Sequence, residues 1–272
     1  MKHYLYNSLA NNGIRPKLPD DVKPVDARGI DYAAFLETLP PEDEVVLIGG
    51  DGTLNYFVNA IDPDQLRHNI YLLGSGTGND FFTDIGKKAG DEVLINPYIR
   101  NLPTVRVKGI EKRFLNNMGF GIDGYCCEVA DQIKEKTPGK KINYPGIAIK
   151  GLLFHFKPCH AEITIDGQKQ EFDHVWIAPT MKGRYYGGGM NMAPDQDRSQ
   201  NRVSVVVYHC RSKLKALIVF PSIFKGEHVK RTDMVSIFTG REIHVRFSRP
   251  CAAQIDGETV LGVTEYSVSQ KE

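Results

Sequence analysis

Residues 45–61 read VVLIGGDGTLNYFVNAI and bring three patterns together. Residues 45–48 are apolar without alternation, which is typical of a strand buried on both faces of a parallel sheet. Three glycines and one aspartate follow in residues 49–52. The next apolar residues lie at the spacing of one helix face: Leu54, Phe57, Val58 and Ile61. The run predicts a strand, a glycine loop and a helix that ends near Asp62.

A second unit of the same kind follows along the chain. Residues 70–73 are apolar and lead into the glycine loop of residues 74–80. This repetition is typical of an α/β crossover arrangement, and residues 4–6, before Asn7, are a candidate first strand of the same sheet. In such loops backbone N–H groups approach phosphate oxygens closely, and the helix beyond adds a partial positive charge. A pair of loops favours phosphate binding over two ordinary tight turns.

The pattern changes near residue 100, after which short strands and turns predominate. Residues 162–165 enter an Asp-Gly turn, and the return strand includes Phe172 and residues 175–178. Further candidate strands are residues 203–208, 235–238, 243–247 and 265–269. We therefore predict an α/β nucleotide-binding domain with a parallel sheet in residues 1–100. A mainly antiparallel β-sandwich domain, which carries the acceptor site, is predicted in residues 101–272.

The composition is that of an ordinary globular protein, with 41% hydrophobic and 25% charged residues among 272. No apolar run is long enough to span a bilayer, and residues 1–12 lack the apolar core of a secretion signal. The five cysteines form no CxxC pair, so neither a disulfide framework nor a zinc ribbon is indicated. These features predict a cytoplasmic protein.

Asp51 is the unusual residue of the first glycine loop. A carboxylate repels a phosphate unless a cation or a transferable proton lies between them, so Asp51 indicates Mg²⁺ or a hydroxyl nucleophile. The chain has no G-x-x-x-x-G-K-[ST] pattern and is therefore not a P-loop enzyme. Thr53 either caps the following helix or reaches a phosphate.

Two other glycine motifs have competing interpretations. Residues 119–124 match G-x-G-x-x-G, but a dinucleotide site wants an acidic residue about 20 positions further on. Residues 139–158 contain no Asp or Glu, so we reject a dinucleotide site there. Asp256-Gly257-Glu258 is either a hairpin turn or a pair of carboxylates that binds Mg²⁺ or accepts a proton. Both interpretations can hold together.

Residues 182–190 combine cations, aromatic rings and glycines. They indicate either an acceptor cleft or a long surface loop, and the candidate substrate residues are Lys182, Arg184, Tyr185 and Gly188. Two further segments, residues 141–158 and 213–225, are amphipathic and basic. Each suits a membrane interface, although helices that pack on a sheet are the favoured interpretation.

Four motifs in this order resemble the diacylglycerol kinase catalytic-domain family: residues 49–55, residues 76–81, residues 187–190 with Ala193-Pro194, and residues 256–258. That family includes bacterial lipid kinases and sphingosine kinases, and NAD kinases and phosphofructokinases are more distant relatives. The resemblance runs from about Tyr4 to Val263. It implies an α/β domain followed by a β-sandwich, with an ATP site between them.

The resemblance also implies roles for individual residues. Asp51 and Asp256 are expected to bind Mg²⁺ and to take part in catalysis. Glu258 or Asp51 is expected to act as the base that takes the acceptor proton. The residues expected to hold the nucleotide are Asn7, Gly49, Gly50, Gly52, Thr53, Gly76, Thr77, Gly78, Asn79 and Asp80.

The chain departs from the family pattern in three places. The segment between Tyr4 and Val45 is shorter than in typical members. Residues 102–107 contain no carboxylate, and residues 195–201 lack an Asp-Gly pair. In the family, carboxylates at these two places help to organise bound cations.

We expect an ATP- and Mg²⁺-dependent kinase that phosphorylates a lipid hydroxyl, of diacylglycerol or a related lipid, in phospholipid biosynthesis. A lipid substrate implies peripheral contact with the inner face of the membrane, and a homodimer is left open. The alternatives are an NAD kinase-like enzyme with a soluble acceptor and a degenerate member that binds nucleotide or lipid without catalysis. No nucleic-acid-binding motif is recognised, so no nucleic-acid partner is expected.

Overall fold

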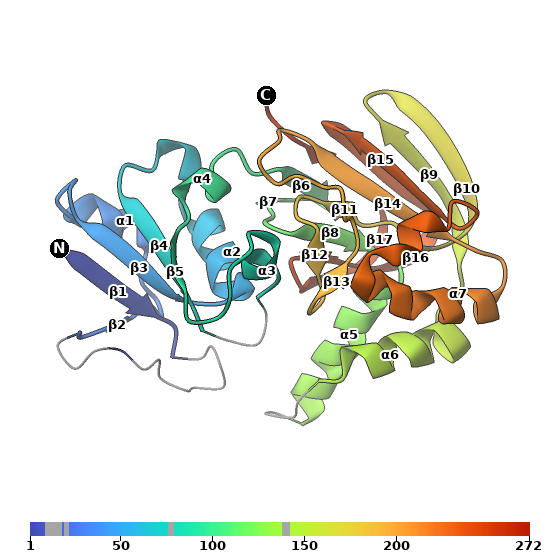
Figure 1. Ribbon diagram of the computed structural model, residues 1–272, viewed down its shortest axis with the longest axis horizontal. Coiled ribbons are helices and arrows are strands. Elements are labelled where there is room, and N and C mark those ends of the chain that lie inside the picture. Colours follow the sequence, from blue (N-terminus) through green and yellow to red (C-terminus); the bar gives the residue numbers. More distant parts are fainter. Residues whose placement is uncertain (9–17, 19–21, 76–78, 138–141) are drawn as a thin grey trace. The chain divides into compact units, whose positions relative to one another are not determined.

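The computed structural model describes residues 1–8, 18, 22–75, 79–137 and 142–272 (Figure 1). The chain forms two compact units, Met1–Leu102 and Pro103–Glu272. The first unit contains the α/β elements, and the second is rich in antiparallel strands. Both parts of the predicted fold class are therefore confirmed.

The first unit is built on a five-stranded sheet in the order β2-β1-β3-β4-β5. Its strands are β1 (Lys2–Tyr6), β2 (Val25–Asp26), β3 (Glu44–Gly49), β4 (Asn69–Gly74) and β5 (Glu92–Leu94). Strands β2, β1, β3 and β4 pair in parallel, whereas β5 joins β4 antiparallel. The parallel sheet thus carries an antiparallel edge strand that the sequence reading did not include. Residues 45–48 are buried because β3 lies between β1 and β4.

Short helices lie between and after these strands: α1 (Tyr32–Thr38), α2 (Asp51–Ala60), η2 (Pro63–Gln65), α3 (Asp80–Asp84) and, after β5, α4 (Asn96–Ile99). Helix α2 buries the predicted face that includes Leu54, Phe57 and Val58. It ends at Ala60, close to the predicted end, because Pro63 starts the next turn and the residue before a proline avoids the helical conformation.

The second unit is built on a ten-stranded sheet. Its strands are β6 (Thr104–Val107), β7 (Ile110–Arg113), β8 (Asn117–Phe120), β9 (Cys159–Ile165), β10 (Gln168–Ile177), β11 (Thr180–Met181), β14 (Val203–His209), β15 (Val235–Gly240), β16 (Glu242–Ile255) and β17 (Glu258–Ser269). The order is β7-β6-β17-β16-β8-β11-β14-β10-β9, and β15 pairs with β14. Strand β16 also pairs with β9 through its first half, so the sheet folds back on itself as a sandwich.

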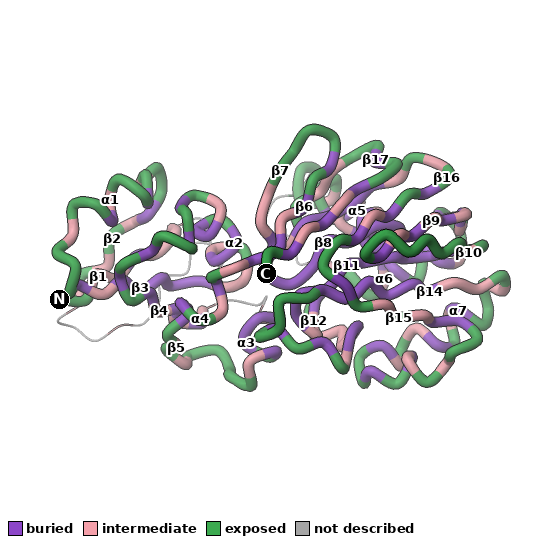
Figure 2. Tube along the Cα trace, turned by 90° about the horizontal axis from the view of Figure 1, so that it is seen from above, coloured by how far each residue is buried: buried purple, intermediate pink, exposed green. Residues whose placement is uncertain are grey.

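Successive side chains of strand β14 point to opposite faces of the sheet and pack in two different hydrophobic cores. Val203, Val205 and Val207 face the interior of the sandwich, where Phe120 and Tyr266 also lie. Val206 and Tyr208 face a second core beneath the helices. Both faces of β14 are therefore buried, and Figure 2 shows the central strands buried and the connecting loops exposed.

Helical segments cover one side of this sheet: α5 (Ile122–Lys136), α6 (Tyr144–Lys150), the π-helical turn η3 (Gly151–His155), α7 (Lys213–Val219), and the 3₁₀ turns η4 (Phe220–Lys225) and η5 (Glu227–Lys230). Figure 1 shows α5, α6 and α7 gathered on the same side. A separate ribbon pairs β12 (Tyr185–Tyr186) with β13 (Met190–Asn191). None of the described helices has the length and apolar character needed to cross a membrane.

Candidate active site

The first glycine loop places a helix N-terminus directly after a buried strand. Strand β3 ends at Gly49, Gly50 is the N-cap of α2, and the helix begins at Asp51. The first N–H groups of a helix have no intrahelical acceptor, and the helix dipole adds positive potential there. This turn is therefore suited to a phosphate group.

Different physical causes explain why glycine occupies different positions of this loop. A Cβ at Gly49 would lie 2.2 Å from Oγ1 of Thr53, so packing within the loop explains that glycine. At Gly52 no described atom outside its chain neighbours and the backbone of α2 lies within 4 Å of the position that a Cβ would occupy. Packing among the described residues does not explain Gly52, and the open space allows a ligand to approach the backbone closely.

Asp51 connects the first loop to the second. Its Oδ2 accepts a hydrogen bond from the Asp80 N–H at 2.9 Å, and its Oδ1 accepts one from the Phe81 N–H at 3.2 Å. The Ser75 N–H also donates to the carbonyl oxygen of Gly49 at 2.9 Å. The Asp51 carboxylate therefore accepts hydrogen bonds from N–H groups in the first turn of α3 and holds the two loops together.

Parallel pairing brings most of the predicted nucleotide residues to one edge of the sheet. Asn7 follows the end of β1, and Tyr6 pairs with Ile48 next to the first loop. Asn79 is the N-cap of α3, and Asp80 is its first residue. Ligand sites of open α/β sheets lie at this carboxyl edge. The predicted residues Gly76, Thr77 and Gly78 lie outside the described residues.

The motif of residues 256–258 forms the turn between β16 and β17. Ile255 pairs with Glu258, and both turn residues, Asp256 and Gly257, have positive φ, 45° and 91°. This geometry belongs to the tight hairpin turns that Asp-Gly favours. The hairpin interpretation is confirmed.

The Asp256 side chain binds a distant backbone segment. Its Oδ2 accepts the Leu115 N–H at 2.6 Å. Its Oδ1 accepts the N–H groups of Asn116 at 2.9 Å and Asn117 at 3.0 Å. Hydrogen bonds to a charged acceptor are stronger than neutral ones, so this carboxylate fixes the entry into β8.

Glu258 is placed differently in the same turn. Its side chain is 61% exposed and forms an ion pair with Nζ of Lys112, on β7, at 2.5 Å. An exposed pair of this kind contributes little to stability. Glu258 is thus more accessible for proton transfer than Asp256 is.

Arg198 is a site residue that the sequence reading missed. Its side chain is buried, and it donates to the carbonyl oxygen of Leu115 at 2.6 Å and to Oδ1 of Asn116 at 2.7 Å. Residues 115–117 are therefore held by two side chains. Asp256 accepts hydrogen bonds from their N–H groups, and Arg198 donates to two of their oxygens. The only sign of Arg198 in the sequence is an arginine within residues 195–201, the segment that lacks the Asp-Gly pair. Its hydrogen-bond partners are seen only in the folded structure.

Lys182 is buried rather than placed at a surface. Its Nζ donates to the carbonyl oxygen of Gln200 at 2.8 Å and to Oε1 of Gln270 at 3.0 Å. Burial, with a smaller contribution from the charge of Arg198, lowers the pKa of Lys182 to about 8. These contacts give Lys182 a role in cross-linking the domain, which disfavours it as a substrate ligand.

The other predicted substrate residues belong to the β12–β13 ribbon. The Arg184 guanidinium lies 5.5 Å from the ring centre of Tyr185, within cation–π range. Gly188 is at the tip of the ribbon, where Gly187, Gly188 and Gly189 all have positive φ. This backbone conformation explains the run of glycines.

The rejected G-x-G-x-x-G motif joins β8 to α5, and packing explains its glycines. A Cβ at Gly121 would lie 2.4 Å from the carbonyl oxygen of Trp176, and one at Gly124 would lie 2.1 Å from that of Ala252. The glycines thus let α5 pack closely on the sheet. Nothing in this arrangement requires a dinucleotide.

The acidic residues available for a metal are spread over both units. Among the described residues, no three His, Cys, Asp or Glu side chains gather into a ready-made metal site. Mg²⁺ in phosphotransfer sites takes most ligands from phosphate and water, with one or two carboxylates. The described residues therefore form no closed protein cage for a metal.

Comparison with known proteins agrees with this architecture. Residues 19–103 match the diacylglycerol kinase catalytic domain. Residues 116–268 match the YegS C-terminal NAD kinase beta sandwich-like domain. An α/β catalytic domain followed by this sandwich defines a class of two-domain kinases. The chain belongs to the diacylglycerol kinase family within it.

Individual relatives are distant in sequence. A diacylglycerol kinase of Mycobacterium tuberculosis is 27% identical over 211 residues, which cover 75% of this chain and 66% of the relative. The chain thus matches just under two thirds of that protein. A diacylglycerol kinase of Bacillus subtilis is 27% identical over 237 residues, covering 84% of this chain and 75% of the relative.

A solved structure shows the same fold. The crystal structure of a diacylglycerol kinase from Bacillus anthracis str. Sterne superimposes with a TM-score of 0.64 at 18% identity. The superposition covers 99% of this chain and 94% of that one. The likeness therefore extends over both units.

Proposed function

We propose that this protein transfers the γ-phosphoryl group of ATP to the hydroxyl group of a lipid, diacylglycerol or a related one. Membership of the diacylglycerol kinase family supports the reaction type. The observation that carries the proposal is Gly52, in the first turn of α2, where the missing side chain leaves room for a phosphate rather than for packing.

The nucleotide is proposed to bind at the carboxyl edge of the first sheet. The N-terminal amides of α2 and the second loop would receive the phosphates, with Asn7, Thr53 and Asn79 at the same edge. The reaction passes through a loose transition state with charge on the transferred oxygens, so positioned N–H groups stabilise it directly. Asp51 would maintain this geometry by holding the two loops together.

Glu258 is the proposed base. It is exposed, whereas the Asp256 carboxylate already accepts three backbone N–H groups. A carboxylate suffices because the acceptor proton leaves late in such a transition state. Mg²⁺, when bound, would neutralise phosphate charge, and Asp51 in the first unit and Asp256 in the second are each proposed as a carboxylate ligand for such an ion. A cytoplasmic enzyme in peripheral contact with the membrane is part of the same proposal.

The test uses γ-labelled ATP, Mg²⁺ and mixed micelles that contain diacylglycerol, with NAD as a soluble acceptor. Glu258→Gln is compared with Glu265→Gln, a half-exposed glutamate on the same strand. We expect labelled lipid with the wild type and the control, and a rate at least about 100-fold lower with Glu258→Gln. Gly52→Ala should raise the KM for ATP without unfolding the protein. If NAD alone becomes labelled, the acceptor is a soluble molecule and the proposed lipid acceptor is wrong.

A member that binds nucleotide without catalysis is the second candidate. It is favoured by the engagement of the acidic groups, since Asp51 and Asp256 accept backbone N–H groups and Glu258 pairs with Lys112. Binding of ATP, measured by calorimetry, with no labelled product from any acceptor would support this candidate and contradict the kinase.

A further inference from the structure

Two helical segments of the second unit lie side by side on its surface. Nζ of Lys213, at the start of α7, donates to the carbonyl oxygen of Leu153 in η3 at 3.2 Å. Each segment buries one side in the second core, through Leu152 in η3 and through Ala216 and Val219 in α7. The favoured interpretation of residues 141–158 and 213–225 as helices packed on a sheet is thus correct for these inner sides.

The outer sides of the same segments expose large apolar residues. Phe154 is 74% exposed, Ile218 is 68% exposed and Leu214 is 66% exposed. Among the large hydrophobic side chains of the described residues, only Met1 is more exposed. Leu214 and Ile218 are one helical turn apart, so they project from one side of α7. Clustered exposed apolar groups of this kind mark an interaction site.

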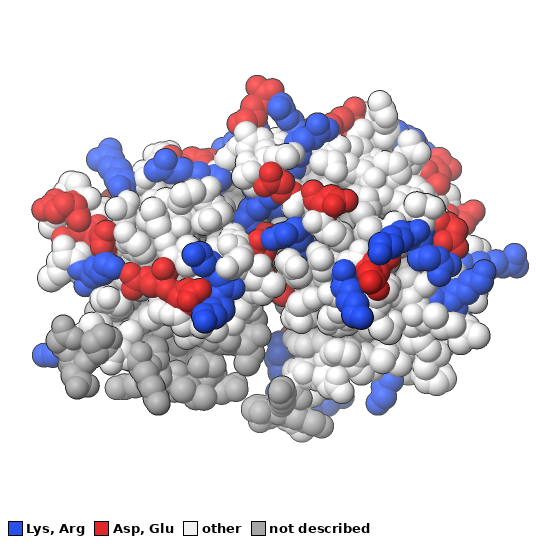
Figure 3. All heavy atoms as spheres, viewed as in Figure 1, with Lys and Arg blue, Asp and Glu red and all other residues white. Residues whose placement is uncertain are grey.

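The surroundings of these apolar groups are basic. We call residues 142–158 together with residues 211–226 the α7 face. It contains no Asp or Glu, and its six cations are Lys150, Lys157, Arg211, Lys213, Lys215 and Lys225. In Figure 3 the surface over α6 and α7 is mostly uncharged, with Lys and Arg and fewer Asp and Glu around it.

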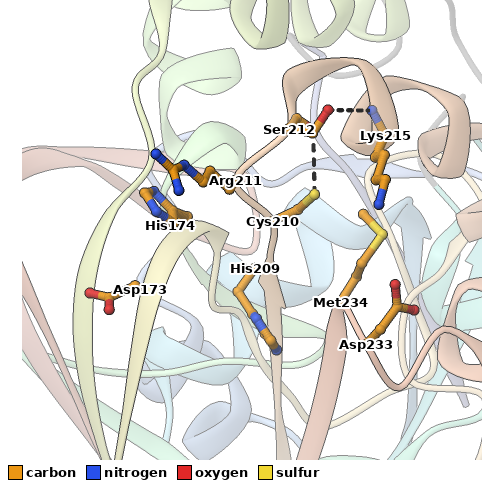
Figure 4. Close-up of a pocket in the computed structure, with 9 residues that line it drawn as sticks. All are labelled: Asp173, His174, His209, Cys210, Arg211, Ser212, Lys215, Asp233 and Met234. Atoms are coloured by element: carbon orange, nitrogen blue, oxygen red, sulfur yellow. Dashed lines mark hydrogen bonds between the residues drawn. The ribbon is translucent and has the colours of Figure 1, made fainter.

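A cavity of about 250 Å³ opens at the beginning of α7. Arg211 and Lys215 are among its nine lining residues (Figure 4), and neither side chain has a hydrogen bond or ion pair within the described part of the chain. Two acidic residues also line it: Asp233 forms an ion pair with Arg231, and the Asp173 carboxylate lies 2.9 Å from Nδ1 of His160. With Arg231 counted, three cations lie around the cavity beside two carboxylates, which leaves a small excess of positive charge.

His209 lines the same cavity without adding to that charge. Burial lowers the pKa of His209, so its ring is neutral near pH 7. It can still donate a hydrogen bond to a phosphate oxygen. An anionic group in this cavity would find two cations and a neutral donor, beside the two carboxylates of the lining.

We propose that the α7 face docks on an anionic phospholipid bilayer, with Phe154, Leu214 and Ile218 in the interfacial layer and a lipid phosphate in the cavity beside α7. The inference rests on the proposed function and deepens it by assigning the surface through which the enzyme meets the membrane that holds its substrate. Amphipathic helices with basic flanks bind membranes in this way. A second copy of the chain fits less well, because two such faces would bring like charges together.

The test measures sedimentation with vesicles in the absence of nucleotide. Wild-type protein is mixed with vesicles of phosphatidylglycerol and phosphatidylcholine, or of phosphatidylcholine alone. Arg211→Gln/Lys215→Gln should reduce partitioning to the anionic vesicles about 30-fold. Leu214→Asn/Ile218→Asn should reduce it at least about tenfold. The matched controls are Lys87→Gln, an exposed lysine of the first unit, and Leu261→Asn, an exposed leucine of β17.

The proposal requires binding to anionic vesicles that both double variants lose and both controls keep. It is overturned if the wild type ignores anionic vesicles or if the double variants bind as the wild type does. It is also overturned if Leu214→Asn/Ile218→Asn converts a dimer into a monomer, seen by sedimentation velocity, while vesicle binding is unchanged.

A second readout separates this proposal from the kinase proposal. The same proteins are assayed on a water-soluble, short-chain diacylglycerol, which needs no membrane. The double variants should retain wild-type activity there and lose activity on vesicles. No phosphorylation by the wild type would count against the kinase alone, whereas normal activity with unchanged vesicle binding in the variants would count against the docking face alone.

Discussion

Asp256→Asn should weaken the second unit by removing one oxygen that binds the entry to β8. The amide oxygen can still accept the N–H groups of Asn116 and Asn117, but the amide NH₂ would face the Leu115 N–H, whose hydrogen bond is 2.6 Å long. A hydrogen bond to a charged group contributes about 1.5–3 kcal/mol, and leaving its donor unsatisfied adds a penalty. We expect the free energy of unfolding to fall by about 2–3 kcal/mol.

The assay follows urea denaturation by the fluorescence of Trp176. This is the only tryptophan in the chain, and it is fully buried within the second unit, so its signal reports that unit. Glu258→Gln is the control from the same turn. Its exposed ion pair with Lys112 should change the free energy by less than about 1 kcal/mol. Equal shifts in the two variants, or no shift in Asp256→Asn, would refute the anchoring role of Asp256.

Three further predictions concern residues outside that turn. Gly124→Ala should destabilise the second unit by about 1–3 kcal/mol in the same urea assay, because its Cβ would lie 2.1 Å from the carbonyl oxygen of Ala252. Burial raises the pKa of Asp123 from 3.8 to about 6, so the folded protein binds this proton more tightly than the unfolded chain. The bound proton stabilises the folded protein below about pH 4, and the free energy of unfolding falls by up to ~3 kcal/mol as the pH rises to about 6. Asp123→Asn should abolish this decline in urea titrations at pH 4–7, and an unchanged decline would contradict it. Asp51→Asn should speed amide hydrogen exchange at the start of α3 about tenfold, and an unaltered rate would show that the carboxylate does not hold the second loop.

The strands and helices with a regular apolar pattern could be predicted, because the spacing of apolar residues indicates which faces are buried. Residues 45–48 are apolar throughout because both faces of β3 are covered, and α2 shows its buried face every three or four residues. The hairpin of β6 and β7 was missed, since its turn at Lys108-Gly109 uses positive φ without an Asn-Gly or Asp-Gly signal.

The site could be predicted only as far as its loops. The Asp-Gly motif correctly indicated a turn, but it gave no sign that the carboxylate binds a segment 141 residues away. Lys182 is a candidate substrate residue by its neighbours in sequence, whereas its hydrogen bonds to residues 200 and 270 hold it in the interior. Such contacts arise from topology, and neighbouring sequence does not encode them.

The double pairing of β16 has a consequence for how the chain folds. Its first half pairs with β9 and its second half with β8, so the strand closes the sandwich by joining segments far apart in sequence. Contacts of long sequence separation are slow to form, because loop-closure entropy is lost before they stabilise the chain. The turn that carries Glu258 follows β16 directly, and the pairing of β16 with β8 fixes its place in the domain. A partly folded molecule would therefore lack the proposed base, and phosphoryl transfer should appear together with the last cooperative step of folding.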